Sequence, residues 1–304
     1  MDGQVTVMTL GYLLLLTGLL AFGMLGIFHK IADHPACRPK MIAVILLFWG
    51  GVMTTIYTAA ANSKGLIFPQ KVLLIGIGGG TMASLALFAF QTGLKFGKIS
   101  TSWLILNLAT SIPILLSIFI FGERVSIGKI AGILLVLAAV VMMWMDKRID
   151  LQKAGVDAGG NRPLNKSKWL PLMLLAFACQ GLAASSQKML VEAKQGDYVW
   201  QFYIVLYWSG FVVMLILSVM REAWPNRREF ATAFVMAICS VIGNVSITTA
   251  LKSVKGVVAF PVSNGGSLSL VVLAGVVFFR EKIHPVGQAG IVCGISAILI
   301  LVLT

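Results

Sequence analysis

The chain has 304 residues, of which 58% are hydrophobic and 12% are charged, and its mean hydropathy is +0.93. Soluble domains carry about 25% charged residues, so the composition excludes a soluble globular enzyme. The formal net charge is +13. Its basic residues lie between long apolar runs, where they set the orientation of a membrane protein, so they do not indicate a nucleic-acid partner.

Ten apolar runs have about the 20 residues that a helix needs to cross a bilayer. A membrane barrel would show segments of about ten residues with alternating hydrophobicity. The sequence therefore predicts an all-α, polytopic integral membrane protein of the cell (inner) membrane. The predicted spans are 7–28, 41–61, 72–95, 99–121, 126–145, 169–190, 199–220, 230–251, 256–279 and 285–303.

The first span is preceded by Asp2, with no basic segment before it and no cleavage pattern after it, so we expect a retained helix and not a signal peptide. Residues 146–168 form the only long polar segment, and their charges, Gly pair and Asn-Arg-Pro are typical of a linker. The predicted organisation is a five-helix unit in 1–145, a linker in 146–168 and a second five-helix unit in 169–304.

The two halves are similar at an offset near 158 residues, with one residue of slippage in places. The matching pairs are Gly23 with Gly181, Lys30 with Lys188, Trp49 with Trp208, Lys95 with Lys252, Asn107 with Asn264, and Glu123 with Glu281. Since five is an odd number, two such units in series must have opposite orientations in the membrane. Inverted repeats are typical of secondary transporters, which bind their substrate near the midplane between the repeats.

The orientation of the chain has two interpretations. Lys and Arg gather in the 146–168 linker, which the positive-inside rule places in the cytoplasm, with both termini outside. The family resemblance described next implies cytoplasmic termini instead.

The chain resembles the drug/metabolite transporter superfamily, of the EamA-domain kind, over essentially its whole length. The resemblance lies in GLKFGKIST (93–101), FGERVSIGKIAGI (121–133), ALKSVKG (250–256) and FFREKIHPVGQAGI (278–291). It implies a ten-helix fold, a central cavity, alternating access, and export or exchange of metabolites or drugs. Arg280 replaces the glycine of the usual motif in the second half.

None of the 11 acidic residues falls near the centre of a predicted span. The related small multidrug transporters carry a Glu in their first span, and this chain has none, which argues against proton-coupled efflux of cationic drugs by that mechanism. The three histidines lie at span ends or in loops, and the four cysteines have no metal-binding spacing. We therefore expect no enzyme activity, no catalytic residue, no metal and no cofactor.

Polar side chains follow single faces of several spans, at helical spacing. In lipid such stripes face protein or a wet cavity, although hydrogen bonding between helices explains isolated hydroxyls without any function. From these stripes the predicted substrate-binding residues are Gln91, Trp103, Asn107, Gln180, Asn244, Asn264 and Ser267.

Three aromatic residues and one lysine complete the predicted site. Trp49 and Trp208 lie mid-span and are equivalent in the repeat, so they fit either core packing or a cavity wall. Tyr207, next to Trp208 in the chain, would contribute to such a wall. Lys188 follows Ser-Ser-Gln and is the best of four repeated lysines to attract a substrate carboxylate; the alternative is a lysine that reaches the membrane surface.

Spans five and ten are almost wholly apolar and carry Gly128-xxx-Gly132 and Gly290-xxx-Gly294. Such spacing lets helices approach closely, so these spans are expected outside the cavity and are candidates for a homodimer contact. The predicted function is transport of a small neutral or zwitterionic metabolite, such as an amino acid. The alternatives are an exporter of drugs or toxic compounds, a channel and a structural membrane protein, and the predicted partners are the substrate and the lipid bilayer.

Overall fold

The computed structural model describes residues 2–32, 37–62, 64–94, 96, 99–153, 166–218, 225–279 and 284–303. Every regular element in these ranges is helical, which confirms the all-α prediction. The elements are α1 (Asp2–Ala32), α2 (Pro39–Ala61), α3 (Gln70–Gly93), α4 (Ile99–Leu108), α5 (Ser111–Phe119), α6 (Ile127–Lys153), α7 (Lys166–Glu192), the short 3-10 helix η1 (Gly196–Tyr198), α8 (Val199–Ser218), α9 (Arg227–Ala250), α10 (Gly256–Phe279) and α11 (Pro285–Leu303).

Eight helices in the described ranges are long and apolar enough to cross a membrane: α1, α2, α3 and α6 to α10. The fourth predicted span is two short helices, α4 and α5, and the tenth corresponds to the shorter apolar helix α11. The predicted linker begins at 146, but α6 continues to Lys153 and α7 starts at Lys166. The helix therefore extends about two turns into the polar segment.

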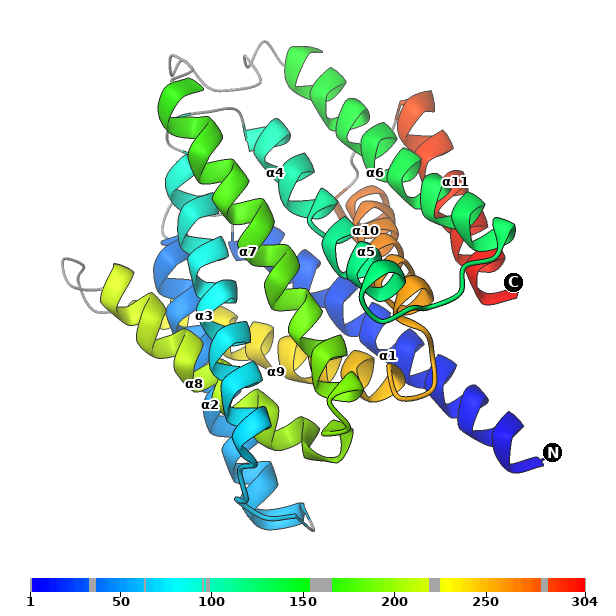
Figure 1. The fold of residues 1–304 in the computed structure, drawn as a ribbon. Coiled ribbons are helices and arrows are strands. Elements are labelled where there is room, and N and C mark those ends of the chain that lie inside the picture. The colour runs from blue at the N-terminus through cyan, green and yellow to red at the C-terminus, as the bar shows by residue number, and fades with distance from the viewer. Residues whose placement is uncertain are drawn as a thin grey trace.

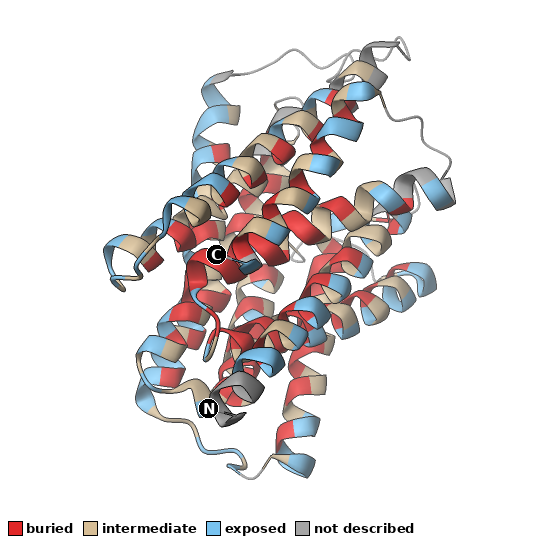
Figure 2. Cartoon of the chain, turned by 90° about the vertical axis from the view of Figure 1, so that its right-hand side faces the viewer, coloured by how far each residue is buried: buried red, intermediate tan, exposed pale blue. Residues whose placement is uncertain are grey.

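Large apolar side chains cover the outside of the bundle. On α1, for example, Leu13, Leu16 and Leu20 are each about half exposed, and Figure 2 shows exposed residues along the outer faces of the helices. A soluble protein rarely exposes so continuous an apolar surface. The outer surface therefore has the character of a lipid-facing one.

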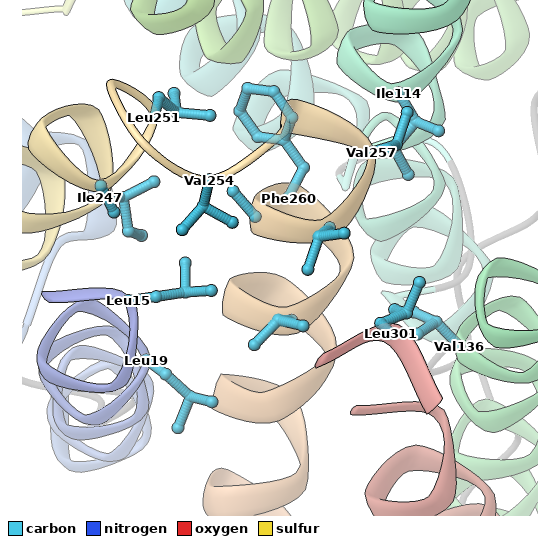
Figure 3. Packing of buried hydrophobic residues seen from close by; sticks show 14 of the residues in the cluster. Leu15, Leu19, Ile114, Val136, Ile247, Leu251, Val254, Val257, Phe260 and Leu301 are labelled. Carbon is cyan, nitrogen blue, oxygen red and sulfur yellow. The ribbon is translucent and has the colours of Figure 1, made fainter. Parts of the chain in front are cut away.

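Buried apolar residues hold helices from the two halves together. One cluster joins α1, α5 and α6 to α9, α10 and α11, with Phe260 of α10 packed among Leu15, Ile114 and Ile247 (Figure 3). A second cluster joins α2 and α3 to α7, α8 and α9. Both clusters draw on both halves, so the core of the protein lies between the halves and not within either one.

Helices α6 and α11 run antiparallel where they meet. A Cβ on Gly132 of α6 would lie 2.6 Å from Leu301 of α11, and one on Gly290 of α11 would lie 3.1 Å from Met142 of α6. Figure 1 accordingly shows the C-terminal end of α11 beside the start of α6. Of the four glycines that motivated the homodimer prediction, Gly132, Gly290 and Gly294 therefore contact helices of the same chain.

A second contact between the halves occurs twice: a glycine of each half packs against an aliphatic side chain of the other. Gly23 of α1 packs against Leu270 of α10, and a Cβ on Gly23 would come within 2.9 Å of it. The equivalent glycine, Gly181 of α7, packs against Ile112 of α5, where a Cβ would come within 2.3 Å. Leu270 and Ile112 are separated by the same 158 residues as the two glycines, so the sequence similarity between the halves extends to this three-dimensional contact.

Candidate functional site

The fourth predicted span is interrupted by a turn at Ala109 and Thr110, between α4 and α5. Pro113 has no N–H to bond the carbonyl of Ala109, and its ring crowds that carbonyl. The N–H of Ile112 bonds Ala109 O instead, at 3.0 Å. Asn107 therefore lies directly before a break in a helix of membrane depth, where freed backbone groups are exposed to solutes in several transporter folds.

The helix α10, which faces this break, contains Pro261 but continues through it. The side-chain amide of Asn264 donates to Phe260 O at 3.1 Å, and the hydroxyl of Ser263 donates to the same carbonyl at 3.2 Å. Ser267 donates to Asn264 O at 3.0 Å. These local bonds hold the Asn264 side chain against its own helix beside the proline.

A small cavity lies between the break and α10. Its polar lining includes Asn107, Thr110, Ser111 and Asn264, and α6 closes it with apolar side chains such as Val136. It leaves about 20 Å³ for the centre of a water molecule, which is room for about one ordered water. Asn107 and Asn264, which are equivalent in the sequence repeat, thus line the same cavity. The fifth predicted span, α6, was expected outside the cavity, but it forms one of its walls.

A separate polar network joins α7, α8 and α9. Asn244 is at its centre: it accepts from Gln187 Nε2 at 3.0 Å and donates to Tyr207 Oη at 3.1 Å and Ser240 Oγ at 3.2 Å. Tyr203 donates to the backbone carbonyl of Asn244 at 2.9 Å. Both tyrosines are fully buried. The predicted residues Tyr207 and Asn244 are therefore in direct contact, in a network whose hydrogen bonds are made within the protein.

The two repeated tryptophans are not part of the cavity lining. Trp49 packs edge-on against Phe230 and Phe234 of α9, and its buried indole N–H has no hydrogen-bond partner among the residues that the structure describes. Trp208 donates its indole N–H to Thr55 at 3.1 Å and lines an open apolar groove of about 300 Å³ between α3 and α8. The structure therefore places the Trp49 indole in helix packing and the Trp208 indole at the edge of this groove.

The remaining polar candidates lie apart from one another. Gln91 on α3 and Gln180 on α7 are half-buried, and neither lines the cavity. Within the described part of the chain, the buried side-chain oxygen of Gln91 has no hydrogen-bond partner. Trp103 belongs to α4, but its side chain lies outside the described part of the structure.

Lys188 is part of a buried ion cluster. Its ammonium lies 2.7 Å from Glu123 Oε1 and 2.7 Å from Glu192 Oε1, and the Lys188 and Glu123 side chains are only 6% and 8% exposed. Glu123 also accepts the backbone N–H groups of Gly256 and Val257 at 2.8 and 2.9 Å, at the start of α10. The lysine charge is therefore balanced by carboxylates of the protein.

The sequence analysis did not select Glu123, although it lies in the Gly-Glu-Arg motif that carries the family resemblance. The sequence offered one signal for it: Glu123 matches Glu281 in the repeat, just as Lys188 matches Lys30, so both members of the ion pair are repeated residues. Helix spacing could not show the contact, because the partners belong to different halves. Among the described residues, no group of three or more His, Cys, Asp or Glu side chains is placed to hold a metal ion.

Comparison with known proteins shows a shared fold and no named relative. No model of a protein family matches the chain, and no curated protein matches it. One solved crystal structure, described only as that of a protein, superposes with a TM-score of 0.74 at 19% sequence identity, covering 97% of this chain and 96% of that one. At this identity the chain is shown to be similar to that protein in fold alone.

Proposed function

We propose that the chain is a secondary transporter that moves a small neutral or zwitterionic solute across the cell membrane by alternating access. One observation carries the proposal: Asn107 and Asn264, equivalent in the internal repeat, line one cavity at a break in a membrane helix. Carriers of this kind commonly bind solutes at interrupted helices between their repeats.

The proposed architecture is ten spans in two inverted five-helix repeats, as in the drug/metabolite transporters of the EamA-domain kind that the sequence resembles. Two observations support it. The equivalent helices α6 and α11 pack antiparallel, as an in-plane two-fold axis between the repeats requires. The contact of Gly23 with Leu270 has its counterpart in Gly181 with Ile112, with both partners exchanged between the halves.

The chemistry of the cavity favours an uncharged or zwitterionic solute. Its described lining consists of amide, hydroxyl and aliphatic side chains and contains no charged group. A lipophilic cation would find no carboxylate there, and a lone anion would find no free ammonium, since Lys188 is paired with two carboxylates. Amides and hydroxyls both donate and accept hydrogen bonds, which suits a polar solute without net charge.

The structure represents a closed state in this proposal. A cavity with room for about one water cannot hold a metabolite, so transport requires that the halves move apart around Asn107 and Asn264. The apolar wall from α6 would then separate from α10 and open the cavity to one side.

The test is transport by purified protein in proteoliposomes. Counterflow of labelled amino acids, nucleosides, sugars and lipophilic cations would identify a solute. Asn107→Ala and Asn264→Ala should each lower its initial rate by at least about tenfold, which corresponds to about 1.4 kcal/mol. Asn62→Ala is the matched control, because that amide lies in the loop between α2 and α3.

Saturable counterflow that depends on both cavity asparagines and not on Asn62 is the expected result. Transport that persists at the original rate in both variants would remove the assignment of the site. A flux that rises linearly with solute concentration and shows no counterflow would instead indicate a channel.

A further inference from the structure

Two ion pairs, each with a buried glutamate, join the halves of the chain, and they lie at opposite ends of the bundle. Arg38 directly precedes the first residue of α2 and pairs with Glu229 in the first turn of α9. Lys188 lies in the last turns of α7 and pairs with Glu123, which follows α5. In each pair, one residue belongs to each half.

The ends are assigned from contacts between helices. The loop that follows the far end of α2 contacts the start of α8, because Gln201 donates to Gly65 O at 2.7 Å. A short segment with η1 joins the start of α8 to the end of α7, so Lys188 lies at the same end as Gly65. Arg38 lies at the other end of α2, which spans 23 residues and hence about 34 Å.

The pair at the Lys188 end can separate without leaving the lysine uncompensated. Glu192, four residues along the same helix, lies 2.7 Å from the ammonium and is 39% exposed. If the halves part, Lys188 keeps Glu192, and Glu123 becomes hydrated as water enters. A buried charge that loses its only partner is strongly destabilising, so this second carboxylate lowers the barrier to opening.

The pair at the Arg38 end has the same design. Glu229 accepts from Arg38 Nε at 2.9 Å and lies 2.9 Å from Arg38 Nη2. Glu229 Oε2 also accepts the backbone N–H of Asn226 at 2.8 Å, within its own half. The Arg38 side chain is 35% exposed and the Glu229 side chain is fully buried. Separation would therefore hydrate the arginine and leave the carboxylate bonded to its own helix end.

We propose that these two ion pairs are the alternating gates of the carrier: Glu123–Lys188 closes one end and Arg38–Glu229 closes the other. The inference rests on the proposed function, since only a protein that opens to each side in turn needs a releasable contact at both ends. The closed state has both pairs formed. Opening toward either side breaks one pair while the other stays formed.

The gates predict opposite effects from two matched neutralisations. Glu123→Gln and Glu229→Gln each remove one negative charge and keep the shape and one accepting oxygen. Because each change weakens one gate, it shifts the population toward the state that is open at that end. A shift of about 1.4 kcal/mol changes the ratio of the open states tenfold.

The experiment measures access to the cavity from each side of the membrane. The four native cysteines are replaced by alanine, and Ser111→Cys places a reporter in the cavity lining. Labelling by a membrane-impermeant thiol reagent is timed in vesicles of both orientations, with a permeant reagent to normalise for protein. Glu123→Gln should raise the rate severalfold from the Lys188 side, and Glu229→Gln severalfold from the Arg38 side.

Asp197→Asn is the control, because it also removes one negative charge near the Lys188 end. Asp197 pairs with Lys252 and is 73% exposed, so its neutralisation should change neither rate. Lys188→Met and Arg38→Gln repeat the test from the basic partner if a glutamine variant does not fold. Equal changes from both sides, or no change in any folded variant, would overturn the gates. The counterflow assay separately decides the proposed function, because labelling needs no substrate.

Discussion

The two halves of the protein differ most where α7, α8 and α9 meet. There Tyr207, Asn244 and Ser240 form the hydrogen-bonded network of the second half. In the first half, the equivalent positions in the sequence repeat are Phe48, Leu87 and Ala83. Positions that match in the sequence are therefore polar and hydrogen-bonded in the second half and apolar in the first.

This difference shows which part of the fold depends on specific partners. In a bilayer, apolar side chains pack against lipid about as well as against each other, so hydrogen bonds and close contacts of small residues supply much of the specificity. We therefore infer that the stability of the second half depends on specific polar partners among α7, α8 and α9, whereas the matching positions of the first half depend on apolar packing. The following substitutions test the comparison.

The largest expected effect concerns the pair of equivalent glycines. In Gly181→Ala, the new Cβ would lie 2.5 Å from the Cβ of Ile112, which cannot move without its backbone. In Gly23→Ala, the nearest atoms are Leu270 Cδ1 at 2.9 Å and Leu270 Cβ at 3.0 Å, so the contact between the two Cβ atoms is less close than at Gly181. We expect Gly181→Ala to cost about 3 kcal/mol and Gly23→Ala about 1 kcal/mol, measured by thermal unfolding in detergent. Equal losses would show that the halves tolerate the same change.

The next effect concerns the centre of the polar network. Replacing Asn244 by the residue of its counterpart, Asn244→Leu, removes side-chain hydrogen bonds to Gln187, Tyr207 and Ser240. At ~0.6 kcal/mol for each bond within a membrane, we expect a loss of about 2 kcal/mol in the same unfolding assay. Leu87→Met, a conservative change at the counterpart, should cost less than about 1 kcal/mol. A larger loss for Leu87→Met would contradict the asymmetry.

A smaller effect is expected from one hydroxyl. Tyr207→Phe keeps the buried ring and removes the bonds to Ser240 at 2.8 Å and to Asn244, so about 1 kcal/mol of stability should be lost. Tyr57→Phe is the control, because Tyr57 is 44% exposed and its stacking on Trp200 does not need the hydroxyl. If both variants unfold at the temperature of the parent protein, the network adds nothing to stability.

The smallest effect is expected at the surface of the second half. Lys252 and Asp197 lie 3.0 Å apart, but both are well exposed, and such pairs contribute about 0.5 kcal/mol or less. Asp197→Asn should therefore leave the unfolding temperature within error, and added salt should not change the result. A clear loss of stability would mean that this pair does more than its exposure implies.

Much of this arrangement could be read from the sequence because it depends on local properties. Helix positions follow from apolar runs of membrane length, and α2, α3 and α7 to α11 lie where these runs predict them. The meeting of Asn107 and Asn264 follows from the register of the repeat. The break between α4 and α5 could not be placed in this way, because Pro113 allows a kink in a helix but does not specify a turn at Ala109 and Thr110.

Other parts could not be read because they depend on the rotation of each helix about its axis. Trp49 and Trp208 are equivalent in the sequence repeat, and Tyr207 directly precedes Trp208. The Trp49 indole packs against α9 and the Trp208 indole bonds Thr55, whereas Tyr207 belongs to the polar network. The sequence favours a substrate carboxylate as the partner of Lys188, whereas in the structure Glu123, from the other half, lies beside its ammonium. Linear spacing carries no information about such partners.

The sequence by itself determined the helical class, the membrane-like composition and the internal repeat, since each is a sum over neighbouring residues or a match between two segments. Only the tertiary structure decided which polar groups share a partner, which glycines admit a neighbouring helix, and which carboxylates bridge the halves. Those contacts join residues that are distant in the sequence, such as Tyr207 with Ser240 and Glu123 with Lys188, and they depend on how whole helices pack in three dimensions.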